Sequence, residues 1–386
     1  MREPTVHPNV VIVGGGVIGL SVAWRLAREG VAVTVIERDR IGRSASWVAA
    51  GMLAPISEAA FDDHDHVTFA RASMARFPSF LAELEPDADA PVHLDTRGTL
   101  VVARDRDDAE YIRRAYEYRR SIGLPVDWLT GSEARDAEPA LSPRIVGAMA
   151  VPDDHQIDTR AFMTALERAC RNRGVTLVEN TTVRCIVTES GRATGVETPA
   201  GLVRADVVVL AAGAWSATID GIPAPCVPPV RPVKGQLVRL RIVEPFPLAH
   251  VIRAPRAYLL PKHDGTVVVG ATQEEMGFDL TPTAGGISDI LRHAWELVPG
   301  IYDLPFDAVE VGLRPGSRDN HPIIGESELG GLVMATGHFR HGILLAPATA
   351  DAVADGVLRG RYTGAEAFAP ARFGAPAGGG HGAHQG

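Results

Sequence analysis

A glycine-rich turn near the start of this chain constrains its fold more than any other feature. Residues 9–13, in which four apolar residues follow Asn9, predict a buried parallel strand, and a helical pattern of apolar residues begins at Val17. Between them, Gly14 permits a tight turn and Gly16 lets the backbone approach a pyrophosphate, while Gly19 lets the helix pack closely on the strand. The sequence therefore predicts the first strand, turn and helix of a dinucleotide-binding unit.

The next apolar run, residues 32–37, completes a βαβ unit and ends in Glu37. A carboxylate at this position can accept hydrogen bonds from the adenosine ribose hydroxyls, and it repels a 2′-phosphate. The helix that begins near Val17 directs its amides and its positive dipole end at the phosphates. The unit is therefore typical of NAD or FAD sites and disfavours NADP, but it does not distinguish NAD from FAD.

A second glycine-rich segment lies near the other end of the chain. Residues 337–345 have the sequence Gly-His-Phe-Arg-His-Gly-Ile-Leu-Leu, and a helix is predicted over 342–360. A helix that starts at Gly342 would direct backbone amides and a positive dipole end at a ligand. Residues 43–55 are rich in Ser, Ala and Gly, which let a backbone approach a ligand closely. One cofactor held by both ends of the chain is the simplest interpretation.

The composition limits the class of protein to which this chain can belong. Its 386 residues are 46% hydrophobic and carry a formal net charge of −9, with no long basic run. These properties argue against nucleic acid or an anionic membrane as a partner. No apolar stretch is long enough to span a membrane. The polar start, residues 1–9, lacks the pattern of a signal peptide, so we expect a cytoplasmic protein.

Three cysteines, Cys170, Cys185 and Cys226, lie far apart in the sequence. Their odd number and wide spacing argue against a disulfide framework and against a metal site. We therefore expect buried free thiols in a reducing compartment, and no bound metal.

The types of predicted strand alternate along the chain and indicate a discontinuous organisation. Helices are predicted over 66–85, 107–123, 157–174 (with Asp158 as N-cap) and 287–296. Strands are predicted over 98–104, 175–179, 183–189, 194–198, 207–212, 236–242, 257–261, 266–270, 307–313 and 331–336. We predict a mixed α/β fold, in which a Rossmann-like domain combines residues 1–75, 150–225 and 311–365, and an antiparallel-sheet domain combines 76–149 and 226–310. The tail, 366–386, is predicted to be disordered.

Further motifs follow the first glycine-rich turn in a definite order. They are Ala-Ala-Gly-Met-Leu at 49–53, Val-Val-Val-Leu-Ala-Ala-Gly-Ala-Trp-Ser at 207–216, Pro-Val-Lys-Gly at 232–235, Tyr-Leu-Leu-Pro at 258–261, Val-Val-Gly-Ala-Thr at 268–272, Gly-Leu-Arg-Pro-Gly at 312–316, and the run 337–349. Together these motifs resemble those of the FAD-dependent amine and D-amino acid oxidase superfamily and, within it, the glycine oxidases of thiamine biosynthesis. The resemblance covers residues 9–360, nearly everything except the tail.

This resemblance implies noncovalent FAD, because covalent members attach the flavin to a cysteine near 338–344 and none of the three cysteines lies there. It implies that the ADP half is held by Gly14, Gly16, Val17, Ile18, Gly19, Glu37 and Arg38, with Val183 contacting the adenine through its backbone. The ribityl chain and the isoalloxazine ring would be lined by Ala45, Ser46, Ala50, Gly51 and Met52, and Gly213 belongs to the same cofactor set. The pyrimidine edge of the flavin would be wrapped by His338, Phe339, Arg340, His341, Gly342, Ile343 and Leu344.

For the substrate, the resemblance implies that Arg314 pairs with a carboxylate through two hydrogen bonds, with Arg340 and Tyr258 in the same pocket. From the residues alone, each arginine could equally be a solvated surface charge, and Tyr258 a strand residue packed on an apolar face. Two positions depart from the glycine oxidase pattern: Gln273 stands where a methionine is expected, and Arg256 where a histidine is expected. These departures leave the preferred amine open.

The resemblance implies oxidative deamination of glycine, or of another small primary or secondary amine, by hydride transfer from the α-carbon to flavin N5. Oxygen would be the acceptor and would yield hydrogen peroxide, and the imine would either hydrolyse to glyoxylate and ammonia or pass to a thiazole synthase. No side chain is assigned as a catalytic base. Two alternatives stay open, which are an FAD-dependent D-amino acid or sarcosine dehydrogenase or oxidase, and a non-redox NAD-binding module. The sequence also leaves the homo-oligomeric state open.

Overall fold

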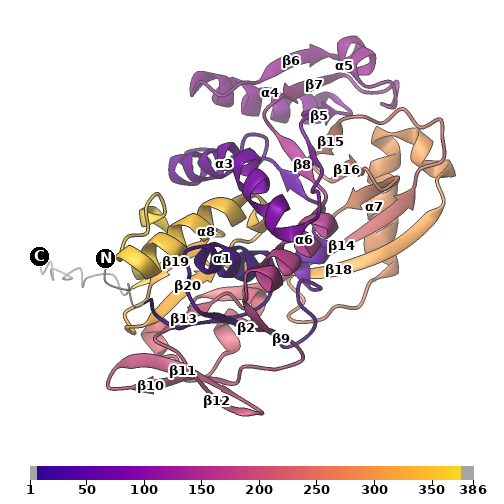
Figure 1. The fold of residues 1–386 in the computed structure, drawn as a ribbon. Helices are drawn as coiled ribbons and strands as arrows, with labels where there is room; N and C mark the ends of the chain where they lie inside the picture. Colours follow the sequence, from indigo (N-terminus) through magenta and orange to yellow (C-terminus); the bar gives the residue numbers. More distant parts are fainter. Residues whose placement is uncertain (1–6, 375–386) are drawn as a thin grey trace, which may run out of the picture.

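The computed structural model describes residues 7–374, which form two large sheets with helices packed around them (Figure 1). The first sheet has the strand order β19 (Ile323–Glu326), β20 (Leu332–Thr336), β13 (Val207–Leu210), β1 (Val10–Val13), β2 (Val33–Ile36) and β9 (Thr176–Val178). Neighbouring strands are parallel except β19, which is antiparallel to β20. The carboxyl ends of the parallel strands therefore meet at one edge of this sheet.

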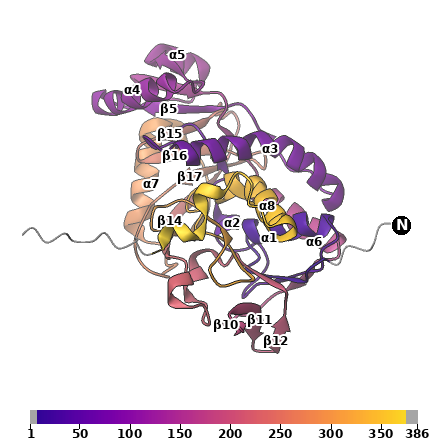
Figure 2. The ribbon, with the colours of Figure 1, turned by 90° about the vertical axis from the view of Figure 1, so that its left-hand side faces the viewer.

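Helices cover one face of the first sheet, and a small sheet covers the other. The helices are α1 (Val17–Arg28), α3 (His64–Ala88), α6 (Thr159–Asn172) and α8 (Gly342–Arg359), which lie on the same side of the sheet in both ribbon views (Figures 1 and 2). They share one apolar core with the strands, in which Trp24 meets Phe80 edge to face with 4.8 Å between ring centroids. The small antiparallel sheet on the opposite face consists of β10 (Cys185–Glu189), β11 (Arg192–Thr198) and β12 (Gly201–Arg204).

The second large sheet extends the molecule away from the first. Its order is β18 (Phe306–Ser317), β14 (Val230–Arg241), β17 (Thr266–Gly270), β16 (Ala257–Pro261), β15 (Val251–Ala254), β5 (Thr99–Ala103), β7 (Gly147–Val151) and β6 (Asp127–Thr130). α7 (Ala284–Leu297) packs on one face of it, and α4 (Arg106–Ser121) packs against β5 and β7 (Figure 1). The long strand β18 reaches the first sheet, where Gly316 forms a β-bridge with His338 beyond β20. This bridge joins the two sheets at the candidate site.

Shorter elements fill the space between the two large sheets and around their edges. A three-stranded sheet has the order β3 (Met52–Leu53), β8 (His155–Ile157) and β4 (Leu94–Asp95). Two short helices are α2 (Ala45–Val48) and α5 (Gly131–Ala137). Short 3-10 helices occur at η1 (Gly213–Thr218), η2 (Ala224–Cys226), η3 (Pro299–Asp303), η4 (Glu366–Phe368) and η5 (Pro370–Phe373).

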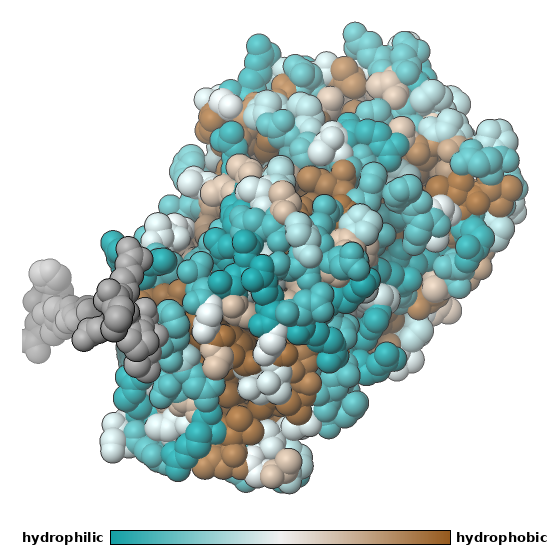
Figure 3. Space-filling model, viewed as in Figure 1, coloured by the Kyte–Doolittle hydropathy of each residue, from teal (hydrophilic) through white to brown (hydrophobic). Residues whose placement is uncertain are grey.

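The surface is mainly polar. Figure 3 shows that hydrophilic side chains dominate the face seen in Figure 1, with the broadest apolar area low in the view. Exposed large apolar side chains include Phe61 and Tyr302 on separate segments, whereas Met276, Phe278 and Leu280 lie close together on one loop. Within residues 7–374, no helix has the length and apolar character needed to cross a bilayer.

Several predicted elements agree closely with the structure, and the predicted mixed α/β fold class is confirmed. The helix predicted to follow the first glycine-rich turn occupies 17–28, and the strands 257–261 and 266–270 pair as an antiparallel hairpin. Asp158 caps α6, because its carboxylate accepts hydrogen bonds from the backbone N–H groups two and three residues later, at 2.9 and 3.0 Å. One difference is that the second sheet is mixed, since β15 pairs with β5 in the parallel sense.

Four predicted domain boundaries fall inside continuous elements, which are β7 (149/150), η2 (225/226) and the two long elements α3 and β18. The boundary at 75/76 lies within α3, whose Phe77, Phe80 and Leu84 are buried in the core of the first sheet. The boundary at 310/311 lies within β18, which pairs with β14 along most of its length. Both elements pass from one layer to the other, so a change in strand type along the sequence does not mark where the layers separate.

The predicted disorder of the tail 366–386 is wrong for its first part. Phe368 is 2% exposed and its ring lies 5.2 Å from that of Phe69, while Arg372 pairs with Asp319 at 2.8 Å. One large aromatic side chain and one ion pair attach residues 366–374 to the first domain, despite their low overall apolar content. Residues 1–6 and 375–386, which include most of the segment examined for a signal peptide and the rest of the tail, lie outside the described residues.

The cysteines differ in part from the expectation. All three are free, as predicted, but only Cys170 is buried, while Cys185 and Cys226 are half-buried. Cys170 lies on the inner face of α6, where burial raises the pKa of its thiol. Cys185 lies in β10 and Cys226 lies in η2, and both side chains are more exposed to solvent than that of Cys170.

We predict that Phe368→Ala destabilises the protein. Loss of a buried phenyl ring from a packed core costs about 3 kcal/mol, so the urea midpoint should fall clearly. Tyr302→Ala is the control, because that side chain is 79% exposed and its loss should change the free energy of unfolding by less than about 0.5 kcal/mol. Equal midpoints for the two variants would contradict the packing of residues 366–374 onto the domain.

Candidate active site

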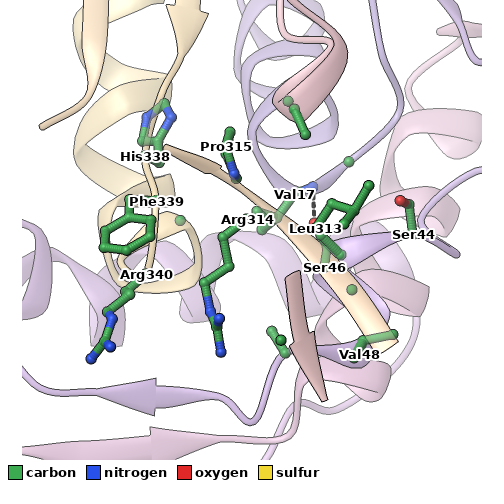
Figure 4. Close-up of a pocket in the computed structure, with 18 of the residues that line it drawn as sticks. Val17, Ser44, Ser46, Val48, Leu313, Arg314, Pro315, His338, Phe339 and Arg340 are labelled. Atoms are coloured by element: carbon green, nitrogen blue, oxygen red, sulfur yellow. Dashed lines mark hydrogen bonds between the residues drawn. The ribbon is translucent and has the colours of Figure 1, made fainter. Parts of the chain in front are cut away.

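A cavity of about 710 Å³ lies between the two large sheets. On one side it is lined by the turns that follow β1, β13 and β20, at the carboxyl edge of the first sheet. On the other side it is lined by residues of β14, β16, β17 and β18. Val17, near the start of the chain, and His338, near its end, therefore face the same space (Figure 4). Ligands of open α/β sheets bind at this carboxyl edge.

The turn after β1 brings backbone groups so close together that only glycine fits. Gly14 has a φ of +106°, and a Cβ there would lie 2.5 Å from the carbonyl oxygen of Ala211. A Cβ on Gly19 would lie 2.0 Å from the carbonyl oxygen of Gly14, so α1 packs directly on the turn. Gly16 instead faces the cavity, where the nearest atom to its Cβ would be Ser46 Oγ at 3.3 Å. The first turn of α1 is thus presented to the cavity with room for a phosphate.

Glu37 lies beside this turn and orders the backbone around it. Its carboxylate accepts hydrogen bonds from the backbone N–H groups of Gly15 at 2.7 Å and Asp39 at 3.0 Å. Because each carboxylate oxygen has more than one acceptor position, Glu37 can still accept a hydrogen bond from a ribose hydroxyl. Arg38 stacks on Trp215, with 3.5 Å from its guanidinium carbon to the ring centroid. The side chains of Glu37, Arg38 and Trp215 line this end of the cavity.

The loop between β20 and α8 lines the cavity at its other end. Gly342 and Ile343, in the first turn of α8, face the cavity and direct the positive end of the helix dipole toward it. His338 is buried, and its Nε2 lies 3.0 Å from the hydroxyl oxygen of Thr349. Burial lowers the pKa of His338 to about 3, so this imidazole is neutral at physiological pH.

Two residues assigned to the flavin edge, His341 and Leu344, do not line the cavity. The His341 ring lies 4.6 Å from the ring of His66, on the side of the loop that faces α3. Leu344 is 1% exposed and belongs to the core of the first domain. The assignment covered the whole run 338–344, but a helix presents only part of its circumference to any one ligand.

Arg314 and Tyr258 project into the cavity from the second sheet, each over a glycine. A Cβ on Gly235 would lie 2.5 Å from the guanidinium of Arg314. A Cβ on Gly270 would lie 2.4 Å from the hydroxyl oxygen of Tyr258. Arg314 Nη1 also donates a hydrogen bond to the carbonyl oxygen of Thr272 at 3.1 Å. Because glycine has no side chain, Gly235 leaves room for the guanidinium of Arg314, and Gly270 leaves room for the ring of Tyr258.

Both side chains present hydrogen-bond donors to the cavity. Burial lowers the pKa of Arg314, but an arginine that starts from so high a value stays protonated at neutral pH. Burial raises the pKa of Tyr258, so its hydroxyl keeps its proton. A guanidinium beside a phenol is an arrangement suited to a carboxylate.

Arg340 extends beside Arg314 into the same space (Figure 4). Its guanidinium contacts the side-chain oxygen of Gln273, and its Nη1 lies 3.7 Å from the carboxylate of Glu58. Glu58 in turn pairs with Arg253 at 3.0 Å. Gln273 therefore tethers Arg340 at the cavity wall. Glu58 and Arg253 are cavity residues that the sequence analysis missed.

Glu58 is the buried acid of this cluster. Burial opposes its ionisation, but the charges of Arg253 and other neighbours hold its pKa below the usual range. A sequence signal existed for Glu58, because it follows the small-residue segment 43–55 that was predicted to contact a ligand. Arg253 had no such signal, because it is placed by the pairing of β15 with β16, where it stands directly opposite Tyr258.

The lining of the cavity fits FAD along its whole length. The residues assigned to the cofactor that line it are Gly14, Gly16, Val17, Ile18, Glu37, Arg38, Ala45, Ser46, Ala50, Gly51, Met52, Val183, Gly213, His338, Phe339, Arg340, Gly342 and Ile343. The start of α1 suits a diphosphate, Glu37 suits a ribose, and the start of α8 suits the electron-rich edge of a flavin. Among the described residues that line the cavity, none is a cysteine.

A family model described as "FAD dependent oxidoreductase" matches residues 9–356. The chain belongs to this family. The glycine oxidase of Geobacillus kaustophilus is 36% identical over 353 residues, which are 91% of this chain and 93% of that protein. The bifunctional protein ThiO/ThiG of Trichormus variabilis is 34% identical over 353 residues, which are 91% of this chain and 52% of that protein. The chain thus spans about half the length of the bifunctional relatives it matches.

Solved structures agree with the fold of this FAD-dependent oxidoreductase. The glycine oxidase of Geobacillus kaustophilus superimposes with a TM-score of 0.88 at 36% identity, covering 97% of this chain and 100% of that one. The iminodiacetate oxidase of Chelativorans sp. BNC1 superimposes with a TM-score of 0.83 at 29% identity, covering 94% and 99%. The resemblance to glycine oxidases that the sequence motifs indicated is confirmed.

We predict that Gly16→Val produces a folded protein without flavin. The valine side chain would project into the cavity at the first turn of α1, where the diphosphate needs the space. The ratio of flavin to protein absorbance in the purified protein measures the effect. The control is Gly285→Val in α7, where an added Cβ meets nothing within 4 Å. A normal flavin content in the Gly16 variant would refute the assignment of this turn to the diphosphate.

Proposed function

We propose that this FAD-dependent oxidoreductase oxidises glycine, and related small primary or secondary amines, with oxygen. Glycine, O2 and water would give glyoxylate, ammonia and hydrogen peroxide. The observation that carries the proposal is the pair Arg314 and Tyr258, two donors that point into the cavity over glycines. The glycine oxidase of Geobacillus kaustophilus, which matches over most of both chains, supports a substrate of this size.

The side chains at this end bind and orient the substrate. Arg314 takes the carboxylate through two parallel hydrogen bonds, and Tyr258 donates a further one, which fixes the position of the α-carbon. Bound FAD supplies the two-electron acceptor for the hydride that leaves the α-carbon. Gly235 and Gly270 set how deeply both donors, and hence the substrate, sit.

No side chain of the cavity is assigned as a catalytic base. His338 is neutral, but its Nε2 is engaged with Thr349. Glu58 is ionised, but Arg253 holds it in an ion pair. The substrate therefore reacts as the free amine after losing its ammonium proton to water, a form from which hydride transfer needs no base.

FAD would be held noncovalently, by the start of α1 for its diphosphate, by Glu37 for its ribose and by the start of α8 for its pyrimidine edge. The helix dipole of α8 favours negative charge at that edge, which stabilises the reduced cofactor. No cysteine lies among the described residues that line the cavity, so no thiol there is available to bond the flavin.

The proposal extends to the use of the product. The imine is consumed by a thiazole synthase in thiamine biosynthesis, and the bifunctional ThiO/ThiG relatives, of which this chain matches about half, support this step. A cytoplasmic location is part of the same proposal, and the free cysteines fit a reducing compartment.

Peroxide release by the flavin-loaded protein tests the proposal. The amines to compare are glycine, sarcosine, D-alanine and D-proline, and glycine should give ready turnover. If the amines bleach the flavin without air but no peroxide forms in air, the protein is a dehydrogenase with another electron acceptor. If none of the four amines reacts, Gln273 and Arg256 have adapted the pocket to a different amine and the proposal fails.

We predict that Arg314→Leu weakens carboxylate binding while FAD stays bound. Removing one partner of a desolvated charge pair costs about 2 kcal/mol or more, so KM for glycine should rise at least about 30-fold. Arg318→Leu is the control, because Arg318 is exposed just after β18 and outside the cavity lining. Loss of flavin from the Arg314 variant, or an unchanged KM, would contradict the role assigned to this arginine.

A further inference from the structure

One carboxylate stands alone among the positive charges at the substrate end of the cavity. Glu58 is the single acid among the described residues that line this end, where the lining arginines are Arg253, Arg256, Arg314 and Arg340. The other two acids of the lining lie at the nucleotide end, where they balance two arginines; these four residues are Glu37, Asp220, Arg38 and Arg184. Binding a substrate carboxylate accounts for Arg314, but it gives no role to an acid in the same pocket.

The protein uses only one oxygen of the Glu58 carboxylate. The side chain is 8% exposed, and its Oε1 accepts a hydrogen bond from Arg253 at 3.0 Å. Its Oε2 accepts no hydrogen bond from any residue in 7–374, and the Nδ1 of His341 is 3.7 Å from it, too far for one. Burial opposes ionisation, but the neighbouring charges, that of Arg253 first, hold the pKa of Glu58 below its usual range. An ionised, buried oxygen without a donor is costly, so Oε2 is available to a ligand that supplies one.

The turn that carries Glu58 is held by two buried charged side chains that do not themselves line the cavity. Arg119 in α4 is 5% exposed and donates hydrogen bonds to three backbone carbonyls of the turn, at 2.7, 3.0 and 2.7 Å; these belong to Ile56, Ser57 and Ala59. Asp154, which is fully buried, accepts hydrogen bonds from two backbone N–H groups of the same turn at 2.9 and 2.8 Å. Because both charges are used on the backbone of one short turn, Glu58 is fixed in position at the cavity wall.

Glu58 also lies close to the two groups assigned to the substrate carboxylate. Its ion-pair partner Arg253 stands directly opposite Tyr258 in the β15–β16 pairing, so these two side chains share one face of the sheet. After the larger effect of burial, Glu58 contributes to the raised pKa of Tyr258, and it works against the lowering of the pKa of Arg314. In an α-amino acid a single carbon separates the carboxylate from the nitrogen. A carboxylate bound by Arg314 and Tyr258 therefore leaves the nitrogen in the same small region as Glu58.

We propose that Glu58 Oε2 accepts a hydrogen bond from the amino group of the substrate and stabilises the positive charge that develops on its nitrogen. The inference rests on the proposed function and assigns a further residue to it. As the α-C–H bond breaks, its electron pair leaves as hydride to bound FAD, and the nitrogen lone pair forms the C=N bond. A neutral amine thus becomes a cationic imine that keeps both N–H protons, and no proton moves to Glu58. An anionic oxygen beside this nitrogen stabilises the transition state more than the ground state.

The same contact favours the ammonium form of the bound substrate, because a nearby opposite charge raises the pKa of an amine. The other charged or titratable groups that face Glu58 are Arg253, Arg314, Arg340, His341 and Tyr258. Arginines keep their charge over the range in which an amine titrates. Burial lowers the pKa of His341 and raises that of Tyr258, which moves both away from that range. Removal of the Glu58 charge should therefore lower the pKa of the bound amine.

A binding comparison tests the contact without catalysis. Propanoate has a methyl group where glycine has its ammonium group, and neither is oxidised once the flavin has been reduced with dithionite and air is excluded. Ligand-observed NMR titrations of the reduced protein give both dissociation constants. We expect glycine to bind about tenfold more tightly, as one charged hydrogen bond provides. In Glu58→Gln the preference should shrink to about threefold or less, whereas Glu117→Gln, at an exposed position on α4, should preserve it.

The rate of flavin reduction by glycine without air tests the chemical step. In Glu58→Gln the rate at high pH, where the bound amine is neutral, should fall about tenfold or more, because the developing charge loses its partner. The acid limb of the rate should move to lower pH, because the bound ammonium loses its stabilising neighbour. A residue that only maintains the fold would change the rate without moving this limb. An unmoved acid limb would therefore overturn the inference, whatever the rate.

Failure of this inference and failure of the proposed function give different results. Equal affinity for glycine and propanoate in the unmodified protein, with glycine still yielding peroxide, would overturn the role of Glu58 and leave the proposed function standing. This comparison needs no variant, so it decides the matter even where Glu58→Gln loses its flavin. Tighter binding of glycine that depends on Glu58, without turnover of glycine, would support the contact with the amino group and remove glycine as a substrate.

Discussion

The parallel register of the first sheet determines where the rest of the molecule can act. Val13, Leu210 and Met334 lie side by side as the paired residues of β1, β13 and β20. The three turns that follow them must therefore open at the same edge, although they come from the beginning, the middle and the end of the chain. Two of these turns lead into α1 and α8, so two positive helix ends face one cavity. Such a cavity suits a long cofactor with negative charge at separate points.

The second sheet completes the site because β18 passes from one layer to the other. The bridge between Gly316 and His338 joins β18 to the loop before α8, and Arg314 lies two residues before that bridge. The same sheet contributes Tyr258 and the β15–β16 hairpin. The substrate end thus has its own electrostatic character, positive and partly open to solvent, whereas the nucleotide end is balanced. The phosphate and ribose positions are consequently assigned to the first layer, and the carboxylate donors Arg314 and Tyr258 to the second.

The sequence predicted well those parts of the fold and site that depend on short stretches of chain. The turn at Gly14, the helix after it and the cap Asp158 each have a local cause in backbone sterics or capping. The parts it missed depend on contacts between distant segments. Arg253 enters the site only through strand pairing, and the burial of Phe368 depends on a pocket formed by α3. Within the run 338–344, Leu344 turns into the core and the ring of His341 packs against that of His66, so neither residue lines the cavity.

The most direct test of the central claim is a crystal structure of the flavin-loaded protein with methoxyacetate, a carboxylate that cannot be oxidised as an amine. The account predicts FAD along the cavity, its diphosphate at Gly16 and its pyrimidine edge at Gly342. It also predicts the carboxylate within hydrogen-bond distance of both Arg314 and Tyr258. A carboxylate bound elsewhere, or a flavin whose pyrimidine edge faces away from α8, would contradict it.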